Sequence, residues 1–327
     1  MWKIVDEIVT VCYNLYVCIF YIKLKKGTYI KMAEKRKYGD RSDGYRVRKL
    51  DPMHIFMPYL LPKRTDNEAV MNELVNMEKV LAFIEKKNAD SPDFKYTMFH
   101  VICAAVAKTI AMRPKLNYYI INKRYYERNN ISLAFTVKKQ KKDNSSEALA
   151  IVKLDKDSDK APLDEVYSQI KKIVCEVRLE NKDDGATDIM GVLTKIPPFV
   201  LKGVVGLLFF LDAHGWLPRA LVGVDPYHCS AFLSNLGSIK MSASYHHLAE
   251  WGTNSFFAIV GELKKRPRYN DDGSFELIRA LELGLTIDER IADGVYFINS
   301  MKLLKHLLDN PELLELPMNE KIEYDRS

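Results

Sequence analysis

The chain has 327 residues, of which 47% are hydrophobic and 28% are charged, and its formal net charge at pH 7 is +6. This is an ordinary globular composition, long enough to bury a sizeable core in one large or two medium domains. The five cysteines, at positions 12, 18, 103, 175 and 229, show neither a CxxC pattern nor metal-ligand spacing. This spacing does not indicate a cysteine-based metal site, and we expect a reduced, cytoplasmic protein without a bound metal.

The positive charge is concentrated near the N-terminus. Residues 1–31 hold five lysines and two acids, so they carry three of the six net charges. A basic run follows up to residue 49, with Tyr38 and Tyr45 as its possible stacking residues. We interpret residues 32–50 as a solvated, flexible basic arm, and we do not expect nucleic-acid binding.

The first stretch, residues 4–22, is apolar but contains Asp6, Glu7 and Asn14. Its uninterrupted apolar run is too short to span a bilayer comfortably, and it lacks the cleavage site of a signal peptide. A membrane anchor followed by the lysines near residue 25 remains an alternative. Because Met32 opens a plausible soluble N-terminus, we expect residues 1–31 to be dispensable or mis-assigned, and we do not expect a membrane protein.

Helical and strand patterns alternate through the middle of the chain. The pattern between residues 52 and 87 is helical, with apolar residues recurring mainly at i+3 and i+4 from Glu68 to Glu85. An apolar helix over 98–112 and an amphipathic helix over 162–178 follow. Between these two helices the sequence predicts three strands, at 118–121, 131–137 and 148–154. A polar loop, residues 138–147, separates the second strand from the third.

The C-terminal third begins with a second apolar helical region, residues 196–224. Charged and polar residues and Pro218 interrupt it too often for a membrane span, so we expect it to pack against the body or at a subunit boundary. Strands at 228–234 and 255–263 come next. After a turn at 270–273, a long alternating strand runs from Phe275 to Ile287, and a helix begins at Val295.

Two polar motifs bracket this region. The strand ending at Ile287 runs directly into DERIADG, residues 288–294, and SNLG, residues 234–237, lies 55 residues before Glu289. With the helix at 98–112 and the sequence DNPELL at 309–314, these motifs resemble the acyltransferase subunits of 2-oxo-acid dehydrogenase complexes and the related chloramphenicol acetyltransferases. One residue departs from the signature, because Glu289 stands where that family has its catalytic histidine.

The resemblance implies an α/β fold, a two-layer sandwich with helices on one face of a mixed sheet. It assigns residues 51–317 to a catalytic domain and leaves 318–327 as a polar tail. Coenzyme A or acyl-coenzyme A is the implied substrate, with a small-molecule acyl acceptor, and a homotrimer with sites between subunits is the implied assembly. Since no lipoyl domain precedes residue 50, we expect a free-standing form with no bound lipoyl group.

The family's mechanism assigns roles by position. Its histidine removes a proton from a thiol, and its serine stabilises the tetrahedral oxyanion. Ser234 takes the serine's position, in a turn with Asn235 and Gly237, and Glu289 takes that of the base. Asp293 is expected to hold the following turn, and Gly294 to let the chain approach closely.

Replacing histidine by glutamate carries an energetic handicap. Moving a proton from a thiol with a pKa of about 8.5 to a glutamate rather than to a histidine costs about 3 kcal/mol more, roughly 150-fold in rate. Burial can raise the pKa of a carboxyl group and remove most of this difference. His246 and His247 are the alternative bases, with His228 and His54 behind them. Since adjacent residues of an extended segment point to opposite faces, at most one of the pair should enter the site.

Two hypotheses about function therefore stand. The first is a coenzyme A-dependent acyltransferase that uses Glu289 as its base. The second is a catalytically silent homologue that keeps the trimer as a binding or regulatory protein.

Overall fold

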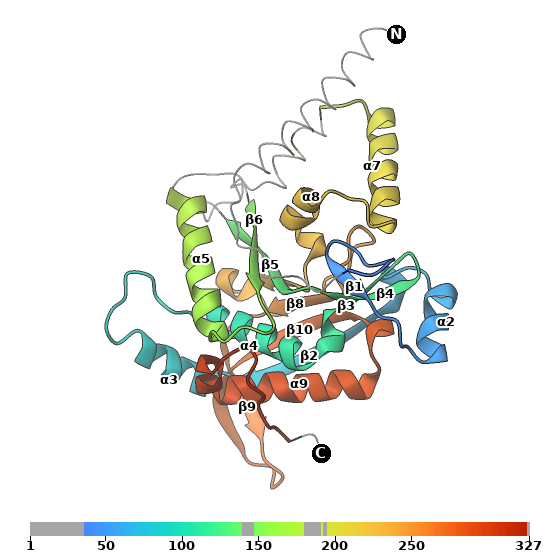
Figure 1. The fold of residues 1–327 in the computed structure, drawn as a ribbon. Helices are drawn as coiled ribbons and strands as arrows, with labels where there is room; N and C mark the ends of the chain where they lie inside the picture. Colours follow the sequence, from blue (N-terminus) through green and yellow to red (C-terminus); the bar gives the residue numbers. More distant parts are fainter. Residues whose placement is uncertain (1–35, 139–146, 180–190, 192–194, 326–327) are drawn as a thin grey trace.

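A computed structural model describes residues 36–138, 147–179, 191 and 195–325 (Figure 1). Within these ranges the main sheet has seven strands, in the order β2, β10, β8, β7, β5, β6, with β9 pairing with β10. Their bounds are Glu68–Asn76 for β2, Ile131–Lys138 for β5, Glu147–Leu154 for β6, Ala231–Asn235 for β7, Phe256–Val260 for β8, Lys264–Tyr269 for β9 and Phe275–Asp288 for β10. The central strand β7 is parallel to both β5 and β8, and the other pairs are antiparallel, so the sheet is mixed.

Helices cover one face of this sheet. They are α3 (Glu78–Lys87), α4 (Met98–Met112), α5 (Pro162–Leu179) and α9 (Gly294–Asp309), and their apolar residues share one core with the inward-facing residues of the strands. The other face carries a smaller apolar cluster that includes Phe232, Leu248 and Phe257. The expected two-layer α/β sandwich, with a mixed sheet and helices on one face, is confirmed.

A second, three-stranded sheet lies beside α2 (Pro52–Leu60) in Figure 1. It is formed by β1 (Gly44–Arg46), β4 (Arg124–Arg128) and β3 (Tyr118–Ile121), all antiparallel. The arm expected to be solvated thus contributes a strand. Arg41 within it is only 4% exposed and forms ion pairs with Asp43 (3.0 Å) and Asp212 (2.7 Å). The sequence did not reveal this packing because the acidic partner Asp212 lies far away along the chain.

The prediction of a helix from Glu68 to Glu85 is wrong for the first half of this segment. Residues Glu68–Asn76 form β2, which pairs with β10 along its whole length, and a helix begins only at Glu78. Val70 and Leu74 point outward, whereas Met71 and Val75 pack against the core. The apolar spacing of this short segment fits both a strand and a helix, and the pairing with β10 decides the outcome.

The C-terminal segment is not a free polar tail. Met318 and Ile322 are buried in the main core. The ammonium group of Lys108, inside the apolar helix α4, donates to the carbonyl oxygens of Pro317 (2.6 Å), Met318 (3.1 Å) and Glu320 (2.7 Å). A buried ammonium needs acceptors, so this contact fixes the segment against the helical layer.

The apolar region at 196–224 forms α7 (Pro198–Ala213) and the short α8 (Arg219–Val224). Among the described residues, no helix is both long enough and apolar enough to cross a membrane.

Candidate functional site

Ser234 lies half-buried near the end of β7, in the turn that the sequence predicts. The Asn235 side chain accepts a hydrogen bond from the Ser238 amide (3.2 Å), and the Ser238 hydroxyl donates to the Asn235 carbonyl (2.8 Å). A Cβ at Gly237 would lie 2.5 Å from the carbonyl oxygen of Gly261, so this position requires glycine. Asn235 and Gly237 therefore shape the turn that holds Ser234 beside the neighbouring strand.

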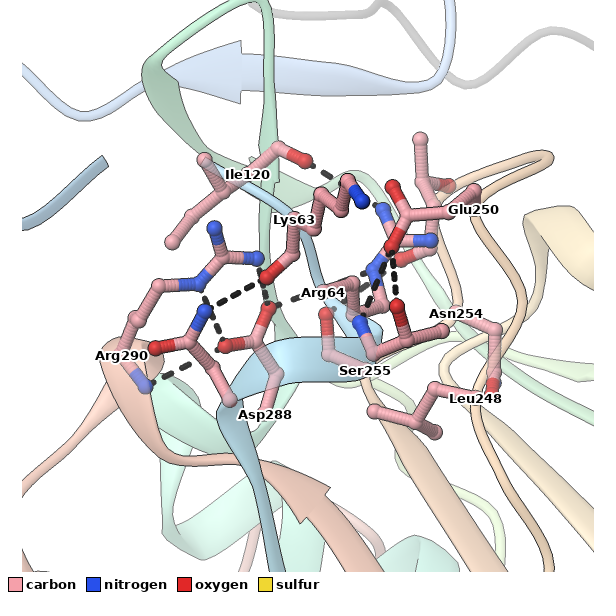
Figure 2. Close-up of polar contacts among 12 residues, drawn as sticks. Lys63, Arg64, Ile120, Leu248, Glu250, Asn254, Ser255, Asp288 and Arg290 are labelled. Carbon is pink, nitrogen blue, oxygen red and sulfur yellow. Dashed lines mark hydrogen bonds and ion pairs between the residues drawn. The ribbon is translucent and has the colours of Figure 1, made fainter. Parts of the chain in front are cut away.

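Glu289 follows directly after β10, at a corner held by a buried ion pair (Figure 2). Asp288 is fully buried, and Arg290 donates two hydrogen bonds to its carboxylate, from Nε at 2.8 Å and from Nη2 at 2.7 Å. The Asp288 amide donates to the Ser255 carbonyl at 3.0 Å. On the other side, Arg64 Nε lies 3.9 Å from the Asp288 carboxylate. The corner is therefore fixed by its own ion pair and by contacts to two other segments.

The two arginines depend on the charge of Asp288 to different degrees. Burial disfavours the charged form of Arg290, but the hydrogen bonds and charge of Asp288 outweigh it and raise the Arg290 pKa. For Arg64, burial dominates and lowers the pKa, although Asp288 and Glu250 act in the opposite direction. Removing the Asp288 charge would therefore leave two buried cations without their main counter-ion.

The Glu289 side chain itself points away from this cluster. It is exposed, and it has no hydrogen bond or ion pair to any residue that the structure describes. Asp293 caps α9 by accepting a hydrogen bond from the Tyr296 amide (2.8 Å), which lowers the Asp293 pKa. A Cβ at Gly294 would meet nothing within 4 Å in the single chain, so the close approach expected there is not found within one chain.

The strand register separates the two predicted catalytic residues. Ser234 pairs with Ile259 on β8, and Ile259 pairs with Gly284 on β10. Glu289 lies five residues beyond Gly284, which corresponds to about 17 Å along the strand and about 10 Å across two strand spacings. Ser234 and Glu289 of one chain therefore lie roughly 19 Å apart and cannot act on the same atom.

His246 is a histidine that packs on the same face of the sheet as Ser234. Its ring stacks on Phe257, with centroids 4.3 Å apart and planes at 7°. Phe257 stacks in turn on Phe232, which precedes Ser234 by two residues and so faces the same side of the sheet. His246 Nδ1 lies 2.8 Å from the His247 carbonyl oxygen, which can only accept. Nδ1 therefore carries a proton, and Nε2 of the neutral ring can accept one.

The two adjacent histidines do not point to opposite faces as expected. Their ring centroids are 4.6 Å apart, and His247 Nδ1 makes its own hydrogen bond to the Leu248 carbonyl (3.0 Å). The segment is irregular rather than extended at this point, so the alternation expected of a strand does not apply.

His228 belongs to a different, buried network. Its Nε2 lies 3.1 Å from Asp212 and its Nδ1 lies 2.9 Å from Asp225. Although burial favours the neutral ring, the two carboxylates raise the His228 pKa to about 9. A histidine that already carries its proton cannot serve as a base at neutral pH. His54 is engaged with Asp51 at the start of α2.

This network predicts a pH dependence of stability. The folded-state pKa of His228, about 9, lies above its value in the unfolded chain, about 6.5. Its contribution is therefore complete below about pH 6.5 and is lost as the pH rises through about 9. We expect the melting temperature to fall between pH 7 and pH 9.5, and to fall less in His228→Gln, as measured by circular dichroism. Equal slopes for the two proteins would contradict this assignment.

Sequence reasoning singled out Ser234, Glu289, Asp293 and the histidine pair as candidates, but it gave no structural role to Asp288 and missed Arg64. Asp288 carried a signal, since a carboxylate at the end of an otherwise apolar strand needs a partner. The sequence carried no such signal for Arg64, because this residue lies more than two hundred residues from Asp288.

Comparisons with known proteins place these motifs in context. Residues 230–316 match the family model described as 2-oxoacid dehydrogenases acyltransferase (catalytic domain). The fold is similar to that of a probable dihydrolipoamide acetyltransferase from Listeria monocytogenes, with 15% identity, a TM-score of 0.52 and coverage of 81% of this chain and 94% of that one. No match was found among curated proteins.

A second similar structure is the dihydrolipoamide acetyltransferase of Azotobacter vinelandii. It has 15% identity, a TM-score of 0.52 and coverage of 88% of this chain and 100% of that one. The work on that protein concerns the role of a serine, a histidine and an asparagine in its catalytic mechanism. A third, with 14% identity and a TM-score of 0.52, is the cubic core of the pyruvate dehydrogenase multienzyme complex, with coverage of 88% and 100%. At these identities the likeness shows a shared fold.

Proposed function

We propose that the chain is an acyltransferase of the 2-oxo-acid dehydrogenase type, which transfers acyl groups between coenzyme A and a small-molecule acceptor; the family model over residues 230–316 and the shared fold support this. The observation that carries the proposal is the pair of motifs within the matched stretch. One is Ser234 in its glycine-dependent turn, and the other is the corner that the Asp288–Arg290 ion pair holds rigid.

In the proposed reaction the thiol of coenzyme A gives its proton to a base, and its sulfur attacks the acyl carbonyl carbon. The Ser234 hydroxyl donates a hydrogen bond to the oxyanion that forms. The intermediate then collapses by breaking the bond to the leaving group, which takes up the proton from the base. Each step can run in reverse, so the same groups serve transfer from acyl-coenzyme A.

The base that we propose is Glu289, by its position in the motif, acting in the site of a second copy of the chain. The separation of roughly 19 Å between Ser234 and Glu289 within one chain supports such a shared site. His246 is the second candidate, because its Nε2 is free to accept a proton and it lies on the sheet face of Ser234. Coenzyme A would then be a substrate in a site built from two copies.

We expect a homotrimer in solution. The outward-facing Val70 and Leu74 on the edge strand β2 support self-association, as does the incomplete site of the single chain. Light scattering coupled to size exclusion should give about three times the chain mass of 37.7 kDa. A monomer that retained full transfer activity would contradict the shared site.

The test of function is a screen of thiol and amine acceptors with acetyl-coenzyme A, following release of free coenzyme A. Ser234→Ala should lower the rate of transfer by about a hundredfold, because it removes the donor to the oxyanion. Ser238→Ala, in the same turn but exposed, is the matched control and should keep most of the rate. If both variants kept the wild-type rate, Ser234 would have no part in the chemistry.

A silent homologue is the alternative, and one observation favours it. The side chain of Glu289 is exposed, and it makes no hydrogen bond or ion pair with the part of the chain that the structure describes. If no acceptor supports transfer and Glu289→His alone creates activity, the protein is a silenced scaffold that binds its ligands without converting them.

A further inference from the structure

Helix α7 (Pro198–Ala213) stands away from the main sheet (Figure 1), and five of its apolar side chains are exposed. Phe199 is 70% exposed, Leu207 56% and Phe210 51%, and Val205 and Phe209 are also exposed. At about 100° per residue, these five positions cover an arc of roughly 200°. A helix that packs on one partner surface needs an apolar stripe only about half as wide. An apolar medium that covers one whole side of the helix fits this distribution better than a narrow protein groove does.

The helix is held in this exposed position by its C-terminal end. Asp212, which is buried, accepts a hydrogen bond from Arg41 (2.7 Å) and lies 3.1 Å from His228 Nε2. The rings of Phe209 and Trp251 meet edge to face, with centroids 5.2 Å apart. The C-terminal end of α7 is therefore firmly attached to the rest of the chain, and the preceding turns of the helix are exposed although this end is fixed.

The length of the helix excludes a span. Its 16 residues extend about 24 Å, shorter than the hydrocarbon core of a bilayer at about 30 Å. Lys202 also interrupts it. Trp216, which follows the helix, is 63% exposed, and tryptophan is the residue that favours the boundary between lipid and water. These features suit a helix lying in the plane of a membrane surface.

The charge around α7 is positive on its accessible side. Lys195, Lys202 and Arg219 are exposed, while Asp212, the acidic residue of the helix, is buried in its ion pairs. The basic segment 36–49 lies at the base of the helix, through the contact of Arg41 with Asp212. Basic side chains beside an apolar helix favour a surface of anionic lipid.

We propose that α7 inserts its aromatic and aliphatic side chains into the surface of an anionic phospholipid bilayer. Lys195 and Arg219, before and after the helix, lie against the lipid phosphates, and Lys202, within the apolar arc, extends its ammonium group to the same phosphates. This contact needs no spanning segment, so it goes beyond the sequence expectation, which concerned insertion across the membrane. It is independent of the proposed acyl transfer.

Sedimentation of the full chain with vesicles tests the proposal. Vesicles of phosphatidylcholine with added phosphatidylglycerol should bind the protein, and the bound fraction should fall with rising salt. The double variant Leu207→Glu, Phe210→Glu should lower the apparent affinity by about tenfold or more. Its matched control is Phe275→Glu, Leu277→Glu, which replaces equally exposed side chains on β10 and should bind like wild type.

Fluorescence adds a direct readout of depth. On binding, emission from Trp216 should shift to the blue and be quenched by brominated lipid, and Trp216→Phe should lose both signals. Unchanged binding by the α7 double variant would overturn the proposal, since another segment would then carry the contact. The absence of vesicle binding by wild type would also overturn it. A third result would overturn it as well. If wild type bound no vesicles and the α7 double variant had a lower molecular mass in solution than wild type, a second copy of the chain would be what covers the helix.

Discussion

Glu289→Gln should lower the rate of acyl transfer by about a hundredfold or more, because it keeps the shape of the side chain and removes the proton acceptor. Glu289→His should preserve or raise the rate, since an imidazole accepts a thiol proton at a cost about 3 kcal/mol lower than an unperturbed carboxylate does. The measurement is the steady-state rate of coenzyme A release with the best acceptor from the screen.

The pH dependence of the rate separates the two candidate bases. If His246 is the base, His246→Gln should abolish the rise of the rate with pH, because the variant has no group at this position that can accept the proton. If Glu289 is the base, His246→Gln should leave the pH dependence of the transfer rate unchanged. His247→Gln is the matched control, because its ring lies beside His246 without stacking on Phe257 in the described structure. An unchanged rate in Glu289→Gln would remove it from the mechanism.

Asp288→Asn should destabilise the fold by about 3–5 kcal/mol. The reason is that Arg290 and Arg64 are both buried, and the neutral amide would leave their charges without the carboxylate that compensates them. Urea unfolding followed by circular dichroism measures the change in the free energy of unfolding. If the variant does not fold at all, Arg290→Met tests the same ion pair from the other side.

The control for this effect is an exposed ion pair. Lys264 and Glu262 lie 2.8 Å apart with the lysine 45% exposed, so Glu262→Gln should change the free energy of unfolding by less than about 1 kcal/mol. If Asp288→Asn were as mild as this control, the buried pair would not be what holds the corner in place. A rigid corner matters for function because it sets the direction of Glu289.

The sequence by itself predicted those parts of the fold whose periodicity is long and unambiguous. Apolar residues recur at every second position from Leu281 to Ile287 in β10, and α4 is apolar nearly all round. The first residues of β10 depart from the expected alternation, since Phe275 and Leu277 are exposed whereas Ile278 is buried. The motifs at Ser234 and Glu289 were also readable, because a family resemblance depends on residue identity and order. The prediction failed at Glu68–Asn76, where the apolar spacing suits a helix and a strand equally well.

Tertiary structure alone decided the questions that depend on residues distant in sequence. Arg64 reaches Asp288 only because β2 and β10 are neighbours, and Arg41 is buried only because Asp212 at the end of α7 lies beside it. The strand register, which no local pattern contains, places Ser234 and Glu289 far apart in one chain and brings His246 onto the face of Ser234. Local sequence fixes which segments are apolar and where they turn, whereas the partners of each buried charge and the distances within the site follow from how those segments pack.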